Sequence, residues 1–408
     1  MKIAFFVPQF PKLSETFILN QVTGLIDRGH HVDVFAMRPS NELAVHEDVE
    51  KYKLSDRTHY LEIPSRTIER VMTGVRLIYS NLKKHPQIVL RSLNILRYRR
   101  RALSLYFLHL VVPFLKNYDV IHCHFGPIGN LGASLKDLGI HAKLITTFHG
   151  FDIRLGLQKG GHTYHALFHK GDCFIAISDY NYNKLTNFGL DERKIVRLPV
   201  GIDMSMFPYK SPSESHEAGT SIRILTVARL VEEKGLQYGI QAIHRLLKQQ
   251  PQLNLKYCII GDGPLKEDLT NLTNKLMLNE VVHFLGPHEQ SGVIEMLQQS
   301  DIFLLPSVAE VLPVCLMEAQ AVGLPVIATE VGDTGHIVLD GKSGFVVKST
   351  NVGALAEKLK YLCEHRQRWS DMGLAGRKNV VRRYDINKLN DRLVEIYANL
   401  LNGRKPPK

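Results

Sequence analysis

The sequence has few cysteines and no long apolar run. Its five cysteines are scattered singly through 408 residues without a CxxC pair, which argues against a disulfide framework or a zinc site and suits reduced thiols. The most apolar stretch near the middle, LYFLHLVVPFL (105–115), contains a histidine and a proline and is much shorter than the roughly 20 residues of a membrane span. The amino terminus, MKIAFFVPQFP, has one basic residue and lacks the small-residue cleavage site of a signal peptide, so we expect a cytoplasmic protein.

Low-complexity tracts are also missing. With 44% hydrophobic and 22% charged residues, the composition is typical of a globular protein rather than a disordered or fibrous one. A chain of 408 residues is too long for one ordinary core, because domains contain roughly 100–200 residues. We therefore expect two domains.

Acidic residues are scarce between residues 66 and 101. This segment holds ten lysines or arginines against one glutamate, a net charge of +9 in a chain whose total is +11. The basic residues alternate with Val, Leu, Ile and Tyr, which suits anionic lipid head groups, a phosphate-bearing acceptor or nucleic acid. A solvated helix surface explains the pattern equally well, and nucleic acid ranks last because no binding motif accompanies the charge.

Short apolar runs, each followed by a polar or glycine-containing loop and a helical stretch, recur along the first half. They are KIAFFV (2–7), VDVFAM (32–37), DVIHCHF (119–125), KLITTFH (143–149) and CFIAIS (173–178). Alternation of this kind predicts a parallel α/β sheet over residues 1–206.

The periodicity stops and then restarts. Residues 207–220, FPYKSPSESHEAGT, have the composition of a linker. A second series of strands follows: IRILTVAR (222–229), LKYCIIGDG (255–263), VVHFLG (281–286), DIFLLP (301–306), PVIATE (325–330) and GFVVK (344–348). We expect a second doubly wound domain over 221–385, a final helical stretch (386–408) that returns to the first domain, and a ligand cleft at the carboxyl ends of both sheets.

Two glutamates stand in the apolar stretch AEVLPVCLMEAQAVGLPVIAT (309–329). Pro313 suits the first turn of a helix, so we expect a helix that begins one residue before it, with Glu310 in the preceding loop and Glu318 on the second turn. Carboxylates accept hydrogen bonds from vicinal hydroxyls, and the free N–H groups at the helix start, from Val314 on, bind anions. The pair predicts a site for a sugar or ribose beside a phosphate, with two ordinary surface glutamates as the simpler alternative.

Two further segments follow strand ends. ARLVEEKG carries Arg229 and Lys234, which together can hold a diphosphate and neutralise its charge as it leaves, although surface cations are common. IIGDGPLKEDL places Gly261 and Gly263 between a strand and a helix. Because the third glycine of a dinucleotide fingerprint is missing, this segment predicts a tight turn beside a bound nucleotide.

The first domain has histidines at its strand ends. TTFHGFDI places His149, Gly150 and Asp152 at one of them, where the histidine can bond a sugar hydroxyl or phosphate and the aspartate can orient it or an acceptor. His122 and His124 alternate on the preceding strand. A structural or substrate-facing role is expected for these two, because no carboxylate cluster matches them as a metal site.

Taken in order, the motifs ARLVEEKG, IIGDGP and FLLPS, the two glutamates with seven residues between them, and GKSGFVV resemble the retaining glycosyltransferases of the GT-B fold. The amino-terminal FPKLSETFILNQ, with HFGP and FHGFDI, is similar to bacterial enzymes of exopolysaccharide and colanic acid assembly. The resemblance covers nearly the full chain.

This resemblance implies roles for single residues. Arg229 and Lys234 would grip the donor diphosphate, Glu318 would bind the ribose hydroxyls, and Glu310 would contact the donor sugar. His149 would touch that sugar from the other domain. It also implies catalysis without a metal or other cofactor, and retention by front-face attack in which the departing phosphate accepts the acceptor's proton.

Three segments depart from the family pattern. Val311 stands where relatives usually have glycine, and VGDTGHIV (331–338) replaces a Gly-Gly-x-Pro-Glu loop. PKLSET, with Ser14, Glu15 and Thr16, replaces an amino-terminal Gly-Gly loop. The first two changes fall on the phosphate and sugar side of the donor pocket, so we expect them to affect the choice of donor.

We therefore expect a retaining glycosyltransferase that moves a sugar from a nucleotide-diphosphate sugar to a lipid-linked oligosaccharide or polysaccharide intermediate of bacterial surface polysaccharide biosynthesis. Segment 66–101 would dock it on the anionic inner face of the membrane, and nucleic acid is not an expected partner. A nucleotide-sugar epimerase on the same fold and an inactive nucleotide-sugar-binding scaffold are open alternatives.

Overall fold

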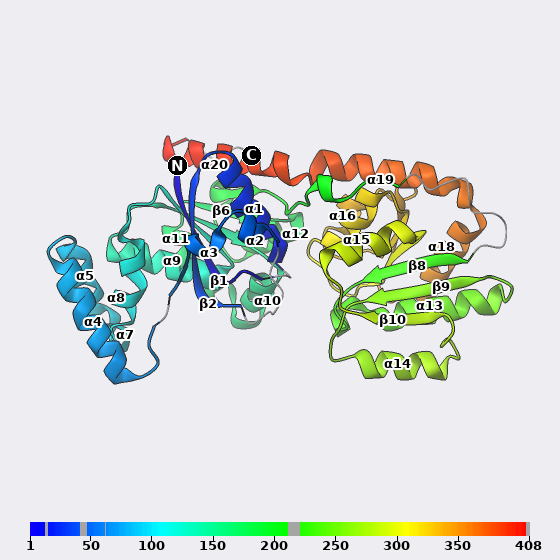
Figure 1. The fold of residues 1–408 in the computed structure, drawn as a ribbon, viewed down its shortest axis with the longest axis horizontal. Coiled ribbons are helices and arrows are strands. Elements are labelled where there is room, and N and C mark those ends of the chain that lie inside the picture. Colours follow the sequence, from blue (N-terminus) through cyan, green and yellow to red (C-terminus); the bar gives the residue numbers. More distant parts are fainter. Residues whose placement is uncertain (13–14, 41–46, 62, 211–220, 405–408) are drawn as a thin grey trace. The chain divides into compact units, whose positions relative to one another are not determined.

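The chain forms two compact units. The computed structural model describes all residues except 13–14, 41–46, 62, 211–220 and 405–408 (Figure 1). Unit 1 comprises Met1–Leu198 and Asn390–Lys408, and unit 2 comprises Pro199–Leu389. Most of the expected linker, 207–220, lies outside the described residues.

Unit 1 is built on a sheet of seven parallel strands in the order β3-β2-β1-β4-β5-β6-β7. The strands are β1 (Lys2–Phe10), β2 (His31–Pro39), β3 (Thr58–Tyr60), β4 (Val120–His124), β5 (Lys143–Phe148), β6 (Cys173–Ala176) and β7 (Ile195–Arg197). Every residue of β4 is buried, as expected for a parallel strand covered on both faces.

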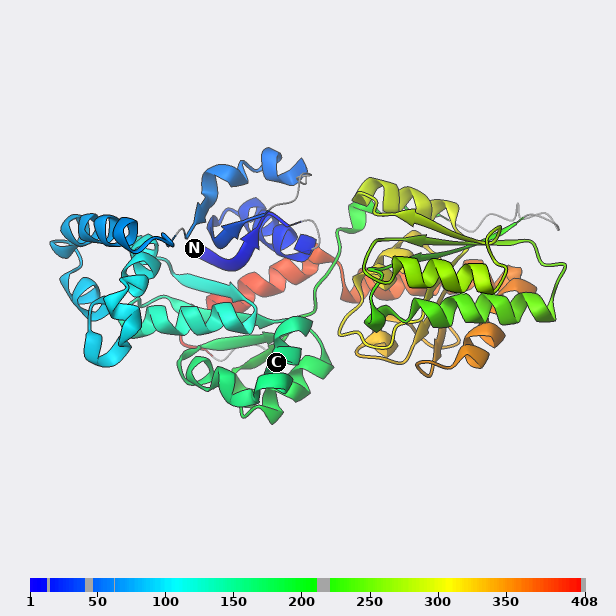
Figure 2. The same ribbon diagram turned by 90° about the horizontal axis from the view of Figure 1, so that it is seen from below.

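Helices connect these strands and cover both faces of the sheet (Figure 2). They are α1 (Thr16–Asp27), α2 (Glu47–Lys51), α3 (Leu54–Arg57), α4 (Thr67–Leu82), α5 (Pro86–Ser92), α6 (Ile95–Tyr98), α7 (Arg100–Leu103), α8 (Tyr106–Val111), α9 (Gly126–Leu138), α10 (Gly150–Lys159), α11 (His165–Lys170) and α12 (Asp179–Asn187). Within the described part of the chain, no helix is both long enough and apolar enough to cross a membrane.

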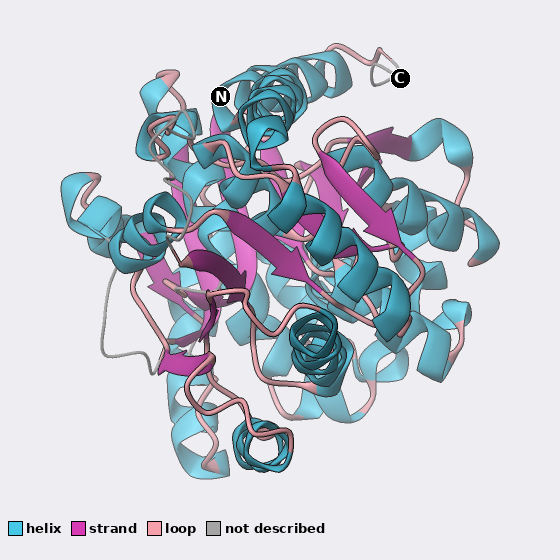
Figure 3. Cartoon of the chain, turned by 90° about the vertical axis from the view of Figure 1, so that its right-hand side faces the viewer, coloured by secondary structure: helices cyan, strands magenta, loops and turns pink. Residues whose placement is uncertain are grey.

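Unit 2 has six parallel strands in the order β10-β9-β8-β11-β12-β13. These strands are β8 (Ile222–Val227), β9 (Leu255–Ile260), β10 (Val282–Gly286), β11 (Ile302–Leu305), β12 (Val326–Thr329) and β13 (Gly344–Val347). Its helices are α13 (Leu236–Gln249), α14 (Lys266–Lys275), α15 (Gln290–Gln299), α16 (Val314–Val322), α17 (Thr334–Ile337), α18 (Val352–Glu364) and α19 (Trp369–Arg383). In both units helices flank the strands (Figure 3).

Both strand orders reverse direction beside the first strand of the unit, β1 in unit 1 and β8 in unit 2. This reversal is typical of doubly wound sheets, in which ligands bind outside the carboxyl ends of the strands near the reversal. The prediction of two doubly wound α/β domains is confirmed.

The last helix, α20 (Ile386–Leu401), begins in unit 2, and its residues from Asn390 onward belong to unit 1. Within unit 1, Nδ2 of Asn390 donates to the carbonyl of Asn20 at 3.0 Å. Nε of Arg28 pairs with Asp391 at 2.7 Å. These contacts attach the helix to α1.

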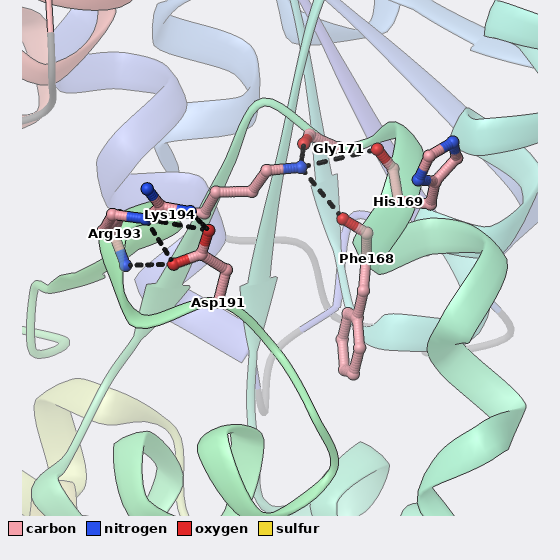
Figure 4. A network of polar contacts seen from close by, with 6 residues as sticks. All are labelled: Phe168, His169, Gly171, Asp191, Arg193 and Lys194. Atoms are coloured by element: carbon pink, nitrogen blue, oxygen red, sulfur yellow. Dashed lines mark hydrogen bonds and ion pairs between the residues drawn. The ribbon is translucent and has the colours of Figure 1, made fainter.

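The edge strands β3 and β7 were not predicted from the sequence, because each is only three residues long. A polar network just before β7 fixes that edge (Figure 4). The ammonium of Lys194 donates to the carbonyls of Phe168 and Gly171, at 3.0 Å each, at the end of α11. Arg193 pairs with Asp191 at 2.7 Å in the same turn. Lys194 thereby supplies donors to carbonyls that a helix end leaves without partners.

Candidate functional site

A partly buried ion pair lies in the unit 2 loops that follow β8 and β11. Lys234 ends a short 3₁₀ helix, and its Nζ lies 2.5 Å from Oε1 of Glu310. Ser307 Oγ donates to the same oxygen at 2.8 Å. The side chain of Lys234 is 18% exposed and that of Glu310 is 9% exposed, so water reaches little of the pair. An ammonium has three N–H donors, so Lys234 can meet an anion while it stays bonded to Glu310.

Two glycines let the backbones of these loops touch. Gly235 has φ +56°, and a Cβ there would lie 2.4 Å from the carbonyl oxygen of Pro306. Gly332 has φ +54°, and a Cβ there would lie 2.3 Å from the carbonyl oxygen of Glu310. Neither position accepts a side chain without movement, so both glycines fix the distance between the loops.

Two of the three departures from the pattern that the sequence resembles, Val311 and the 331–338 segment, touch each other. Asp333, in the 331–338 segment, donates its N–H to the carbonyl of Val311 at 3.0 Å. Residues Thr334–Ile337 of that segment form the single turn of α17. The 331–338 segment is therefore bonded to the loop that holds Glu310.

Helix α16 begins at Val314, two residues later than expected, because Pro313 takes an extended conformation and serves as the N-cap. Its first N–H groups have no partner within the helix and are available to an anion. Glu318 lies on the second turn, and burial raises the pKa of its carboxyl to about 7. Burial also raises the pKa of the Cys315 thiol to about 12, while Lys234 and both glutamates act on that thiol electrostatically. The lysine and both glutamates thus lie within electrostatic reach of the first turn of α16.

The loop of Arg229 follows β8, and the turn that contains Gly261 and Gly263 follows the neighbouring strand β9. Arg229 is exposed, and its guanidinium has no hydrogen bond or ion pair with another described residue. Gly261 and Gly263 have φ +136° and +159°, and Cβ atoms there would lie 1.9 Å and 2.5 Å from the carbonyl oxygens of Ala228 and Leu230. The glycines therefore let the turn after β9 lie directly on the Arg229 loop. Their contact with a nucleotide stays a prediction.

In unit 1, His149 lies at the carboxyl end of β5 as the N-cap of α10. Its ring centroid is 4.7 Å from each of the rings of Phe17 and Phe125, and its Nε2 is 3.2 Å from Nδ1 of His124. Burial lowers the pKa of His149 to about 3. The imidazole is therefore neutral at neutral pH and acts through hydrogen bonds rather than through charge.

Asp152 holds the loop of His149 through the backbone. Its carboxylate accepts the N–H of His149 at 2.7 Å and the N–H of Gly126 at 2.8 Å. Burial raises its pKa to about 7, and no part of the residue is exposed. The side chain thus positions His149 and the first residue of α9, Gly126, but has no surface open to a ligand in this structure. Gly150 is the first residue of α10.

His122 is a buried structural residue. Its Nδ1 lies 2.6 Å from the hydroxyl of Tyr397 in α20, and its Nε2 lies 2.7 Å from Oγ1 of Thr147. His124 is equally buried and stacks on it with ring centroids 4.6 Å apart. Burial lowers the pKa of both, so the stack is neutral.

Three residues at these sites were not predicted. Ser307 bonds Glu310, and Phe17 and Phe125 enclose His149. Ser307 has a sequence signal, because it is a polar residue directly after a buried strand. Phe125 has none, because its φ of +74° reflects tertiary contacts that a sequence pattern does not reveal.

Two cavities lie away from the predicted residues. One of about 440 Å³ in unit 2 has Glu232, Tyr238 and Val308 among its lining residues, and these flank the Lys234–Glu310 pair in the sequence. Another of about 810 Å³ lies in unit 1 at the amino ends of β4 and β5, the edge opposite His149. None of the predicted site residues lines either cavity.

Comparison with known proteins accounts for both units. Residues 14–206 match the family model described as glycosyltransferase family 4, and residues 210–379 match the model described as glycosyl transferases group 1. The amylovoran biosynthesis glycosyltransferase AmsK of Erwinia amylovora is 34% identical over 411 residues, which cover 98% of this chain and 100% of AmsK. A proposed colanic acid biosynthesis glycosyltransferase, WcaL of Salmonella typhimurium, is 35% identical over 373 residues, or 88% of this chain and 90% of WcaL.

Solved structures agree in fold. The crystal structure of Anabaena HepE in complex with UDP superposes with a TM-score of 0.73 at 16% identity and covers 98% of this chain and 100% of that chain. Sucrose-phosphate synthase from Thermosynechococcus elongatus gives a TM-score of 0.71 at 16% identity, over 99% of this chain and 100% of that chain. The fold is therefore GT-B, and the chain belongs to the glycosyltransferase family that includes the amylovoran and colanic acid biosynthesis glycosyltransferases.

Proposed function

We propose that this glycosyltransferase moves a sugar, with retention of anomeric configuration and without a metal, from a nucleotide-diphosphate sugar to a lipid-linked saccharide intermediate of surface polysaccharide synthesis. The names of its relatives support the pathway class, since AmsK and WcaL are named for two such polysaccharides. A more distant relative in Escherichia coli, 24% identical over 326 residues that cover 76% of this chain and 82% of that protein, is named as a galactosyltransferase from UDP-Gal to a diphosphoundecaprenol-linked sugar. Its printed name combines the donor and acceptor classes proposed here.

The observation that carries the proposal is the shielded pair of Lys234 and Glu310 beside the start of α16. A diphosphate needs positive partners, and this region offers an ammonium, the first N–H groups of a helix and, in the same loop as Lys234, the unpaired guanidinium of Arg229. A sugar hydroxyl needs acceptors, and Glu310 has one carboxylate oxygen outside the bonds from Lys234 and Ser307. The local chemistry therefore suits both ends of a sugar diphosphate.

Glu318 suits the ribose. Its carboxyl sits one turn into α16, and burial keeps it near its point of protonation at neutral pH, so it can accept or donate a hydrogen bond to a vicinal diol. We assign His149 to a contact with the transferred sugar, for which a neutral imidazole supplies one donor and one acceptor. Asp152 holds that histidine in position.

The reaction breaks the bond between the anomeric carbon and the diphosphate oxygen and forms a bond from the same carbon to an acceptor hydroxyl oxygen. The acceptor's proton passes to the departing diphosphate oxygen on the same face, which accounts for retention without a protein nucleophile. Lys234, Arg229 and the start of α16 stabilise the negative charge that grows on the leaving diphosphate. In this scheme they supply the positive charge that a divalent cation provides in other transferases.

A transfer assay tests the proposal. Purified protein is incubated with labelled UDP- and GDP-sugars and a lipid extract of the source cells, with and without EDTA, and the label is followed into the organic phase. We expect one donor to label the lipid fraction equally in both conditions and Glu310→Gln to abolish labelling. The glycosidic bond of the product should have the donor's anomeric configuration.

Other outcomes of this assay would support one of the alternative functions. Conversion of the donor to an isomeric nucleotide sugar without lipid would establish an epimerase and contradict the proposal. Nucleotide binding without turnover of any donor would establish a binding scaffold. Labelling that EDTA abolishes would contradict metal independence alone.

A further inference from the structure

Helix α4 carries an apolar stripe on its solvent side. The side chains at positions 68, 72, 75, 79 and 82 follow spacings of four and three residues and so share one face of the helix. They are among the most exposed large apolar residues of the chain: Ile68 78%, Met72 70%, Val75 59%, Tyr79 89% and Leu82 40%. An α-helix rises 1.5 Å per residue, so the stripe is about 21 Å long.

The opposite side of α4 is fixed to the protein. Gly74 is buried, and a Cβ there would lie 2.4 Å from Cδ1 of Leu105. Oγ1 of Thr73 lies 3.0 Å from Nε2 of His109 in α8. The helix therefore cannot rotate to bury its stripe without breaking these contacts.

The following short helices also carry exposed apolar residues. Leu90 is 62% exposed, Ile95 52%, Leu96 96% and Leu103 62%. They lie on α5, α6 and α7, which with α4 and α8 form one group of helices at the side of unit 1 (Figure 1). Exposed apolar residues that gather on one helix face, as in the α4 stripe, are typical of a docking face.

The same segment is strongly basic, and nearly all of its charges lack a carboxylate partner among the described residues. Ten basic residues and one acid occupy 66–101. Arg97 pairs with Asp137 at 2.9 Å, and none of the other nine has a carboxylate partner among the described residues. Arg76 on α4 and Lys83, the residue that caps its carboxyl end, flank the stripe along one side.

We propose that the α4 stripe and the basic residues of 66–101, together called the docking surface, bind an anionic lipid bilayer. Helix α4 lies in the plane of the interface with its stripe among the acyl chains, while the arginines and lysines meet the phosphates of the head groups. Amphipathic helices flanked by basic residues bind membranes in this way because apolar burial and electrostatic attraction add.

The charge of segment 66–101 and the apolar stripe together favour an anionic bilayer over other partners. A second copy docked on the same surface would bring two segments of net charge +9 together, which is repulsive. Nucleic acid would neutralise the charge but leave the stripe in water. An anionic bilayer satisfies both components at once.

The inference does not depend on the donor site, but it fits the proposed function, since a lipid-linked acceptor lies in a membrane. It goes beyond the charge of 66–101, because it assigns insertion to named apolar residues that electrostatic attraction alone does not require. If the membrane-docking inference fails its test, the proposed donor site is not affected, because nucleotide binding is measured separately and without lipid.

Co-sedimentation with vesicles tests the docking surface. Wild type, Met72→Asp/Tyr79→Asp and Arg99→Gln/Arg100→Gln/Arg101→Gln are compared on phosphatidylglycerol-containing and pure phosphatidylcholine vesicles. Met277→Asp is the matched control, because Met277 is 89% exposed in unit 2. We expect wild type and the control to bind anionic vesicles, and both other variants to bind at least about tenfold more weakly. Nucleotide-induced thermal shifts should be equal in all four proteins, which shows that each is folded.

A fluorescent variant reports insertion directly. The chain has one tryptophan, Trp369, which is 1% exposed in unit 2 and gives a constant background. We expect the emission of Tyr79→Trp to shift to shorter wavelength on anionic vesicles and to be quenched by brominated acyl chains. An unshifted spectrum with vesicles bound would show adsorption by charge alone and would overturn insertion.

Two further results would overturn the proposal. The double aspartate variant could bind anionic vesicles as tightly as wild type. Alternatively, wild type could be a dimer by analytical ultracentrifugation and ignore vesicles while that variant is monomeric, which would assign the surface to a second copy.

Discussion

At the scale of single residues, the contact between Lys234 and Glu310 defines the unit 2 site. The pair is 2.5 Å apart and largely shielded, so each charge depends on the other for compensation. A diphosphate that approaches Lys234 adds to this network rather than breaking it, because the ammonium has further donors. The pair therefore holds Lys234 in place before a donor arrives.

Removal of Lys234 should weaken nucleotide binding. A hydrogen bond to a charged group contributes about 1.5–3 kcal/mol, so Lys234→Ala should raise the Kd for the nucleoside diphosphate roughly 10- to 100-fold in titration calorimetry. Lys248→Ala is the control, because Lys248 is exposed on α13 and has no ion pair among the described residues. Equal affinities for all three proteins would remove Lys234 from the donor site.

Glu318 should make unit 2 less stable as pH rises. Its pKa is raised by burial from 4.5 to about 7, so the folded state favours the protonated form. The stabilisation that this proton provides is complete below about pH 4.5 and is lost as pH rises through about 7. Glu318→Gln carries no such penalty, and the free energy of unfolding in urea should favour the variant more at pH 8 than at pH 4.5, by up to about 3 kcal/mol.

Burial also raises the pKa of Asp152 to about 7. This residue is present in both proteins, so its contribution to the free energy of unfolding cancels in the comparison. A difference between variant and wild type that does not change between the two pH values would show that Glu318 is ionised at its ordinary pKa. It would then be a solvated carboxylate.

Single residues also show what the sequence could and could not predict. Glu310 and Lys234 were chosen from their positions after buried strands, and the fold brings them into contact because such loops share one edge of a parallel sheet. That Asp152 is fully buried and bonds backbone N–H groups was not predictable. Gly126, the first residue of α9, lies 26 residues before Asp152 in the sequence, and only the fold brings the two together.

At the scale of elements, the strand pattern was predicted well because parallel strands covered on both faces are continuous apolar runs. All the predicted strands occur in the structure, whereas the edge strands β3 and β7 were missed. A three-residue edge strand has too few buried positions to produce a pattern, and β7 depends on tertiary contacts such as those of Lys194. The start of α16 was placed early, because a proline suits both the first turn and the cap.

The junction between the Lys234 loop and β11 depends on Gly235. Gly235→Ala would add the strain of φ +56° and a contact of 2.4 Å with the Pro306 carbonyl, so the loop must move away from Glu310. Gly341→Ala is a matched control, since Gly341 has φ +69° but open space around its Cβ. We expect Gly341→Ala to cost about 1 kcal/mol of unfolding free energy and Gly235→Ala about 1–3 kcal/mol more.

Only Gly235→Ala should also weaken nucleotide binding, because only that substitution displaces Lys234. Calorimetry on both variants separates this local effect from general loss of stability. If the two variants lose stability and affinity equally, the contact with Pro306 has no special role.

At the scale of the whole molecule, the chain distributes its chemistry unevenly. Unit 2 holds the cations, carboxylates and helix start that suit a nucleotide-diphosphate sugar. Unit 1 holds the neutral histidine stack and nearly all of the excess positive charge, in 66–101. Fold and family follow from the sequence as a whole. The identity of the donor does not, because we expect it to depend on loops such as 331–338, for which no sequence pattern is known.

The most direct test of the account is thermal unfolding of the purified protein with UDP, GDP and their common sugar conjugates, with magnesium or with EDTA, repeated for Glu318→Ala. A ligand that binds only the folded state stabilises it by about 2.7 kcal/mol at 100 times its Kd, so no acceptor is needed. We predict that one nucleotide family raises the melting temperature equally with magnesium and EDTA, and that Glu318→Ala reduces this rise. The absence of a shift with every nucleotide, or a shift unchanged in Glu318→Ala, would contradict the donor site described here.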